Sequence, residues 1–439
     1  MFKETSKELL NFLSKSPTAF HAVENYRQIL NADGFKELLE SEHWDIVPGG
    51  KYYVTRNNTS ILAFKVGTKL DNYSFNIVTS HTDSPTFKVK ENAEIEVKNK
   101  YTQLNTEGYG GVLCATWLDR PLSIAGRVLV SEGNSIVTKL LNIDRDLLMI
   151  PNVAIHMNRA ANDGFKYNLQ VDMLPLLSGG DDRQKDFKQI IADELGVKKE
   201  DILGHDLYLY NRMAPSIWGA NEEFISAGHL DDLQCGFASL KALLAGYNDE
   251  SIDIMACFDN EEVGSGTKQG ADSTLLRDTL IRINNALGKT EEDYHRALAS
   301  SFMLSADNAH AVHPNHPEHT DVTNCTYMNE GVVVKSHAGQ KYTSDGVSMA
   351  VVKSLASGAD VPLQYFANRS DKAGGSTLGN IAMAQASMNA VDIGLPQLAM
   401  HSSYETAGIK DTYYAIALMK ALFDSHIQET STHSLEIKR

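Results

Sequence analysis

The sequence predicts an α/β fold, in which a mixed sheet is flanked by helices and interrupted by a strand-rich insertion. After residue 224, short apolar runs alternate with helical patterns, which is typical of a sheet covered on both faces. From about residue 92 to 223 the chain instead shows short alternating runs, such as AEIEVK and LSIAGRVLV, typical of half-buried strands. We therefore expect residues 1–91 and 224–439 to form one domain around an inserted β-rich domain of residues 92–223.

The N-terminal part is expected to begin with two helices and continue with three strands. Leucines recur at helical spacing over residues 5–15, and a second helical pattern covers 18–33. Strand-like stretches follow at 51–57, 59–66 and 74–80.

The second half supplies the regular alternation of strands and helices. Apolar runs that predict strands lie at 252–258, 302–306, 331–335, 363–367 and 391–400. Helical patterns lie between or after them, at 233–247, 345–357, 377–388 and 411–428. One amphipathic helix is expected inside the insertion, near 183–196.

Composition excludes several classes of protein. The chain has 439 residues, enough for two domains, with 42% hydrophobic and 22% charged residues. A net charge of −16 without a long basic block argues against nucleic-acid binding. The sequence contains no apolar run of about 18 residues, so no membrane span is predicted. The four cysteines are far apart and form no CxxC pair, and no secretory signal is recognisable, so we expect a cytoplasmic protein.

Side chains that bind metals follow the predicted strands. In an open α/β sheet, ligands gather beyond the carboxyl ends of the strands. Imidazoles and carboxylates together suit zinc, and a carboxylate can bridge two ions. Of two adjacent glutamates, one can bind metal while the other takes a proton from water. The residues are His81 and Asp83 in HTD, Asp231 in HLDD, Asp259, Glu261 and Glu262 in DNEE, Asp307 after FMLSA, and His401 after LPQLAM.

These segments resemble the motifs of the aspartyl aminopeptidase family, a branch of the cocatalytic zinc peptidases. The matching segments are HTDSP (81–85), HLDDL (229–233), DNEEVGS (259–265), SADNAHAVHPNH (305–316) and LPQLAMHSSYE (395–405). TWLDRPLSIAGRV (116–128), IPNVAIHMNR (150–159) and GGSTLG (374–379) extend the resemblance over most of the chain. It implies a zinc-peptidase-like fold and a metal-dependent aminopeptidase that removes single N-terminal residues from peptides, with a preference for Asp or Glu.

The resemblance also implies a role for each candidate residue. Asp231 would bridge two zinc ions, which cobalt or manganese could replace. Glu261 would be the general base, and Asp83 would support His81. One zinc would be completed by His81 and Asp307, and the other by Glu262 and His401.

The insertion would mediate assembly into a homo-oligomer, in this family a tetrahedral dodecamer. There His156 would reach a neighbouring subunit's active site and donate a hydrogen bond to the oxyanion. Lys335, at the end of the strand GVVVK, is the candidate cation for a substrate carboxylate, although it also fits an ordinary solvated lysine. Arg369 and Lys372 compete with it for that role.

Two other functions stay open. The same two-metal core would serve an amide deacylase or a carboxypeptidase, and a self-assembling binding shell could keep the ligands without activity. The chain also departs from the family at Asp232, where the family usually has asparagine, and in the segments SHAGQKYTSDG and SDKAGGST, close to where the substrate side chain is expected.

Two further patterns are expected to be structural. Histidines recur every third residue from His310 to His319 and superficially suggest a metal-binding tract. Pro314 and Pro317 interrupt the run, so the histidines cannot share one helical face, and we predict a loop. The glycine-rich segment 107–111 is also assigned to a loop without chemistry.

Overall fold

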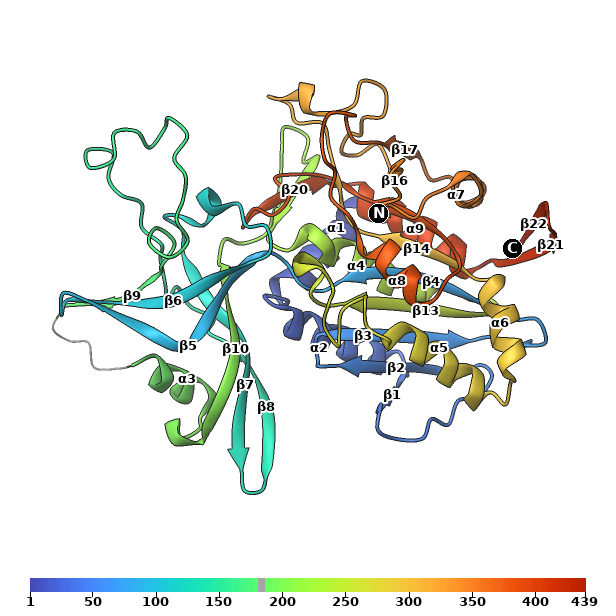
Figure 1. The fold of residues 1–439 in the computed structure, drawn as a ribbon, viewed down its shortest axis with the longest axis horizontal. Coiled ribbons are helices and arrows are strands. Elements are labelled where there is room, and N and C mark those ends of the chain that lie inside the picture. Colours follow the sequence, from blue (N-terminus) through green and yellow to red (C-terminus); the bar gives the residue numbers. More distant parts are fainter. Residues whose placement is uncertain (181–185) are drawn as a thin grey trace.

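The computed structural model describes residues 1–180 and 186–439 (Figure 1). Its centre is a nine-stranded mixed sheet, which confirms the predicted α/β class. In spatial order its strands are β1 (Lys36–Leu38), β2 (Lys51–Arg56), β3 (Ser60–Val66), β13 (Ser251–Phe258), β4 (Ser74–His81), β14 (Phe302–Ala306), β18 (Asn389–Gly394), β16 (Val332–Lys335) and β17 (Leu363–Phe366).

Helices cover both faces of this sheet. Along β13, Met255 and Cys257 pack on one face while Ile254 and Ala256 pack on the other, as the two-residue period of a strand requires. The first face carries α1 (Phe2–Ser14), α2 (Ala19–Ala32), α4 (Leu230–Ala245), α7 (Gly346–Gly358) and α9 (Asp411–Phe423). The second carries α5 (Leu275–Ala286), α6 (Glu291–Ala299) and α8 (Leu378–Gln385).

The four central strands determine where functional side chains meet. Strand β4 runs parallel to both β13 and β14, and β14 runs parallel to β18. Their carboxyl ends therefore lie at one edge of the sheet, which is where ligands bind in open α/β sheets.

A second, six-stranded sheet stands beside the central sheet (Figure 1). It has its own apolar core, in which Phe87 and Trp117 meet edge to face at 5.3 Å. Its first strand begins at Thr86, ahead of residue 92. Its strands, in spatial order, are β8 (Ser135–Asn142), β7 (Leu122–Glu132), β10 (Ile202–Asn211), β5 (Thr86–Val97), β6 (Tyr101–Tyr109) and β9 (Leu176–Gly179).

A five-stranded sheet joins segments from distant parts of the chain. Its strands are β11 (Ser216–Trp218), β12 (Phe224–Ala227), β20 (Glu405–Gly408), β19 (Pro396–Leu398) and β15 (Ala309–His310). The apolar run 391–400, predicted as one strand, is thus two: β18 ends in the central sheet and β19 begins in this one. The C-terminal helix also ends earlier than predicted, and β21 (His426–Ser431) pairs with β22 (Ser434–Lys438) as a hairpin.

The helix predicted in the insertion is α3 (Phe187–Leu195), and residues 183–185 of that prediction lie outside the described residues. None of the helices in the described residues combines the length and apolar character needed to cross a membrane.

Candidate metal centre

Seven predicted residues meet at the carboxyl edge of the central sheet. His81 ends β4, Asp307 follows β14, and the glutamates form a short 3-10 helix, η3 (Glu261–Val263), after β13. Three overlapping groups have ligand atoms within 4.8 Å of one another: His81, Asp231 and Asp307; Asp231, Glu262 and His401; and His81, Glu261 and Glu262. Asp83 lies directly behind them.

Asp231 faces both histidines, one with each carboxylate oxygen. Its Oδ1 is 3.4 Å from Nε2 of His81, and its Oδ2 is 3.6 Å from Nε2 of His401. Glu262 Oε2 lies 3.4 Å from the same His401 nitrogen. Two ligand atoms that share one tetrahedral zinc ion lie about 3.4 Å apart, given Zn–N and Zn–O distances of about 2.1 Å. These spacings therefore fit one ion on each side of Asp231.

Both imidazoles are oriented by main-chain carbonyls. Nδ1 of His81 lies 3.0 Å from the carbonyl oxygen of Asp83, and Nδ1 of His401 lies 3.0 Å from that of Gly111. When each Nδ1–H donates to its carbonyl, each Nε2 is left with a lone pair for a metal. Asp83 was expected to accept a hydrogen bond from His81. The structure places the backbone oxygen of Asp83 closest to Nδ1 of His81, while the Asp83 carboxylate is 3.4 Å from the same nitrogen.

The Asp83 carboxylate fixes the glutamate pair. Oδ1 accepts a hydrogen bond from the backbone N–H of Glu261 at 3.1 Å, and Oδ2 accepts one from that of Glu262 at 3.2 Å. The Tyr109 hydroxyl also donates to Oδ2, at 2.7 Å. Burial and the Asp83 charge hold the pKa of Tyr109 above its usual value, so the phenol stays a donor.

The centre holds more negative charge than its own cations balance. Burial, followed by the nearby charge of Asp231, raises the pKa of Glu262 well above its usual value. Burial also raises the pKa of Asp307, despite the neighbouring Lys335. Oδ1 of Asp231 and Oε1 of Glu262 are buried without a hydrogen-bond partner. Buried carboxylates in this state are stabilised by bound cations, so the donor set fits divalent zinc.

The comparison with protein families identifies the family of the chain. The model of the family described as aminopeptidase I zinc metalloprotease (M18) matches residues 12–423. The chain belongs to the M18 family. It is therefore a zinc-dependent aminopeptidase, as the resemblance implied. The chain is 47% identical over 425 residues to a probable M18 family aminopeptidase 2 of Clostridium novyi, and covers 98% of it. A protein of the same description from Clostridium acetobutylicum is 48% identical over 417 residues, 96% of its length.

Solved structures share the fold over almost the whole chain. The chain in a cryo-EM structure of the Ape4 and Nbr1 complex is 35% identical and superposes with a TM-score of 0.93, over 96% of this chain and 86% of that one. A chain of the S. cerevisiae mApe1 dodecamer is 28% identical, with a TM-score of 0.83 over 96% of this chain and 97% of that one.

Three candidates from the sequence, Asp259, Lys335 and His156, are not in these groups of ligand atoms, although Lys335 borders Asp307. Lys335 is 3% exposed, donates from Nζ to the carbonyl of Asn308 at 2.8 Å, and lies 3.8 Å from Oδ1 of Asp307. Burial lowers the pKa of Lys335, but the charges of Asp307 and other nearby groups outweigh burial and raise the pKa above its usual value. Lys335 therefore stays charged. His156 is exposed, on the segment between β8 and β9 of the six-stranded sheet, and the structure does not bring it to the other site residues.

Sequence reasoning missed three contributions to the centre. Segment 107–111 was predicted to be a loop without chemistry, but it ends β6, and Tyr109 and Gly111 bond to the centre as described above. A Cβ on Gly111 would lie 3.0 Å from Nδ1 of His401, so the glycine itself marked a close approach. Glu405 is buried and accepts hydrogen bonds from the backbone N–H groups of Asp231 (3.0 Å) and His401 (2.8 Å).

Replacing Asp83 should weaken metal binding without removing a ligand. The Asp83 carboxylate accepts hydrogen bonds from the backbone N–H groups of Glu261 and Glu262 and from the Tyr109 hydroxyl. The amide of Asp83→Asn cannot accept all three, so the turn that carries the two glutamates loses its fixed position. We expect zinc affinity to fall by about 10- to 100-fold, as for other partners of metal ligands. Competition with a chromogenic chelator would measure it. Tyr109→Phe, which removes a single donor to the same carboxylate, should have a smaller effect. Native zinc affinity in Asp83→Asn would contradict this positioning role.

Proposed function

We propose that this M18 enzyme holds two zinc ions, with Asp231 between them, and removes single residues from the N-termini of peptides. The observation that carries the proposal is the position of Asp231, which belongs to two of the three ligand groups and faces one histidine in each. His81 and Asp307 would complete one zinc site, and Glu262 and His401 the other. Cobalt or manganese would replace zinc in the same donor set, since nitrogen and oxygen ligands also accept these ions.

Glu261 is the proposed general base. Two zinc ions in the centre would polarise the scissile carbonyl and lower the pKa of the attacking water. Glu261 then accepts the water's proton and returns it to the leaving amine. Burial and the charges of Asp307 and Asp83 raise the pKa of Glu261 to about 8. Nearby divalent cations would lower it again, toward the range that suits a base at neutral pH.

The surplus of carboxylates supports one-residue trimming. A free α-amino group is a cation at neutral pH, so it would donate hydrogen bonds to carboxylates such as Glu262 and Asp231, or coordinate a metal ion once it has given up a proton. A peptide with a blocked N-terminus has no such charge and places an acyl group where the amine should bind. An N-acetylated peptide should therefore be inert, whereas efficient cleavage of it would support a deacylase.

Two cations compete for an acidic substrate side chain. Lys335 borders Asp307 at the centre and is the first candidate. Lys372 and Arg369 line a pocket that also includes Met400, the residue before His401. The Arg369 guanidinium is paired with Asp371 through two hydrogen bonds of 2.9 and 2.8 Å, which leaves Lys372 as the alternative.

A rate comparison tests both the activity and its specificity. Reporter peptides with N-terminal Asp, Glu or Leu should be cleaved in the absence of a zinc chelator, and the chelator should abolish their cleavage. If Lys335 binds the substrate carboxylate, Lys335→Met should lower kcat/KM for Asp and Glu more than for Leu, and Lys372→Met should leave the ratio unchanged. The reverse result would assign the role to Lys372. Equal rates on Asp and Leu in the native protein would end the acidic proposal but not the aminopeptidase proposal.

Assembly is proposed to complete the active site. The segment around His156 exposes Val153 (54%), Met157 (84%) and Val171 (68%), an apolar set that a partner would cover. The similar mApe1 chain forms a dodecamer. We propose a homo-oligomer, in its finer form a tetrahedral dodecamer, in which the 92–223 insertion carries His156 into a neighbouring centre. There its N–H would donate to the oxyanion.

A further inference from the structure

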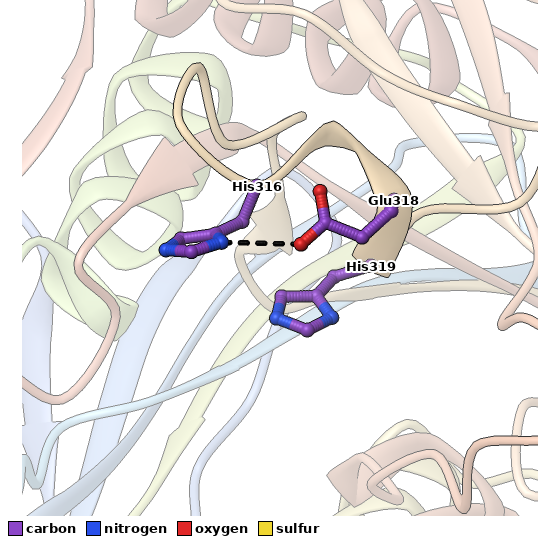
Figure 2. A group of neighbouring side chains, drawn as sticks. All are labelled: His316, Glu318 and His319. Carbon is purple, nitrogen blue, oxygen red and sulfur yellow. Dashed lines mark hydrogen bonds and ion pairs between the residues drawn. The ribbon is translucent and has the colours of Figure 1, made fainter. Parts of the chain in front are cut away.

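A second group of potential metal ligands lies outside the zinc centre (Figure 2). His316, Glu318 and His319 each offer a ligand atom, and these atoms lie within 4.8 Å of one another. They belong to the histidine run after β15, which was predicted to form a loop. The loop contains a short 3-10 helix, η4 (Pro317–His319), and two of the four histidines converge on it.

The local backbone explains this convergence. Residues three apart are eclipsed in a 3-10 helix, and the N–H of His319 donates to the carbonyl of His316 at 3.1 Å. The two rings are stacked with centroids 5.5 Å apart. Pro317 stands at the first position of the turn, where its fixed φ favours the turn and its missing N–H costs nothing. Figure 2 shows the three side chains projecting from the same side of the turn.

The chemistry of the group suits a late transition metal. Glu318 Oε1 lies 3.1 Å from Nδ1 of His316, and both side chains are more than half exposed. Hydrogen bonds from its own backbone and from His316 hold the pKa of Glu318 below its usual value, so it is a carboxylate at neutral pH. Two imidazoles and one carboxylate, with an open position for water, are a familiar zinc ligand set. The side chains are exposed, so they can adjust to an ion at little cost in packing.

His313 is not needed for this set. Its ring is 5.3 Å from that of His316, but its Nδ1 accepts a hydrogen bond from the backbone N–H of Asn315 at 3.2 Å. This hydrogen bond occupies Nδ1, and His313 is not among the grouped ligand atoms. The run of four histidines therefore does not act as one tract.

We infer that His316, Glu318 and His319 form a third metal site, which takes one Zn²⁺, Ni²⁺ or Cu²⁺ ion. The three residues are separate from the ligands of the zinc centre, so the inference does not depend on the proposed mechanism. Arg369 donates from its guanidinium to the carbonyl of Glu318, and both Arg369 and His319 line the pocket beside Met400. A bound ion would thus fix the turn that borders this pocket.

The test is a calorimetric titration of the full-length, zinc-loaded protein with Ni²⁺ at pH 7.5. The native chain and His295→Gln should bind one more Ni²⁺ per chain than the double variant His316→Gln/His319→Gln. His295 is the matched control because it is an exposed histidine 3.9 Å from Glu291, on α6 rather than in the histidine run. The difference between variants counts this site alone, whatever the occupancy of the zinc centre.

Two further measurements sharpen the outcome. Glu318→Gln should bind Ni²⁺ at least about tenfold more weakly, because loss of even an outer partner weakens metal sites by about 10- to 100-fold. Binding at this site should weaken as the pH is lowered from 7.5 to 5.5, because protons compete with the metal ion for the imidazole nitrogens. Circular dichroism would verify that the double variant is folded. Equal stoichiometry and affinity in the native protein and the folded double variant would overturn the inference.

Discussion

Glu261→Gln should reduce kcat by about 10²- to 10⁴-fold, the contribution of a positioned general base. The amide keeps the size and shape of the carboxylate but cannot accept the water's proton. The five proposed ligands stay intact, so zinc content and affinity should remain close to native. Steady-state rates on a free-amine reporter, together with metal analysis of the same sample, would measure both effects.

The neighbouring glutamate provides the matched control. Glu262→Gln changes the next residue of the same 3-10 helix, but it weakens a proposed zinc ligand and should lower metal affinity as well as turnover. If Glu261→Gln lost zinc as Glu262→Gln does, Glu261 would be a ligand rather than the base. Near-native turnover in zinc-loaded Glu261→Gln would remove it from both roles.

His156→Ala should lower kcat by about 10²- to 10³-fold while leaving zinc binding unchanged, because it removes one donor to the oxyanion. Within a single chain His156 is exposed and lies outside the groups of ligand atoms. A large fall in kcat would therefore point to its role in a neighbouring subunit. The next residue, Met157, is also exposed and provides a control. Met157→Ala should retain much more activity than His156→Ala, provided that both variants assemble alike in analytical ultracentrifugation.

Mixing two inactive variants would separate a role in the neighbouring subunit from a role within the same chain. In an oligomer assembled from equal amounts of His156→Ala and Glu261→Gln chains, some centres have Glu261 from one chain and His156 from the other. Random mixing would restore about a quarter of the sites. Activity that stays at the level of the separate variants, after subunit exchange has been verified, would place His156 outside the neighbouring active site.

The strand ends explain why much of the centre could be predicted. Continuous apolar runs such as IDIMACF are typical of strands buried on both faces, and parallel neighbours bring their carboxyl ends to one edge. His81, Glu262 and Asp307 follow three such runs, and the structure brings them together as expected. The sequence spacing alone could not have paired Asp231 with both histidines. That assignment came from the resemblance to known proteases.

The parts that were missed depend on contacts between distant segments. Tyr109 and Gly111 reach the centre from the six-stranded sheet, and hydrophobic periodicity carries no information about how two sheets meet. The run 391–400 was predicted as a single strand because its apolar residues continue through Gly394, where the chain passes from one sheet to the other. Helices α5 and α6 were not predicted, although Leu276, Leu280 and Ile283 have helical spacing.

A zinc titration of activity tests the central claim most directly. Protein stripped by a chelator should be inactive on a free-amine reporter, and activity should return as zinc is added, levelling off at two equivalents per chain. Activity is the appropriate measure because total zinc would also count other sites, including the one inferred at His316. Full activity at one equivalent, or activity that survives complete removal of metal, would contradict a catalytic centre in which Asp231 joins two zinc ions.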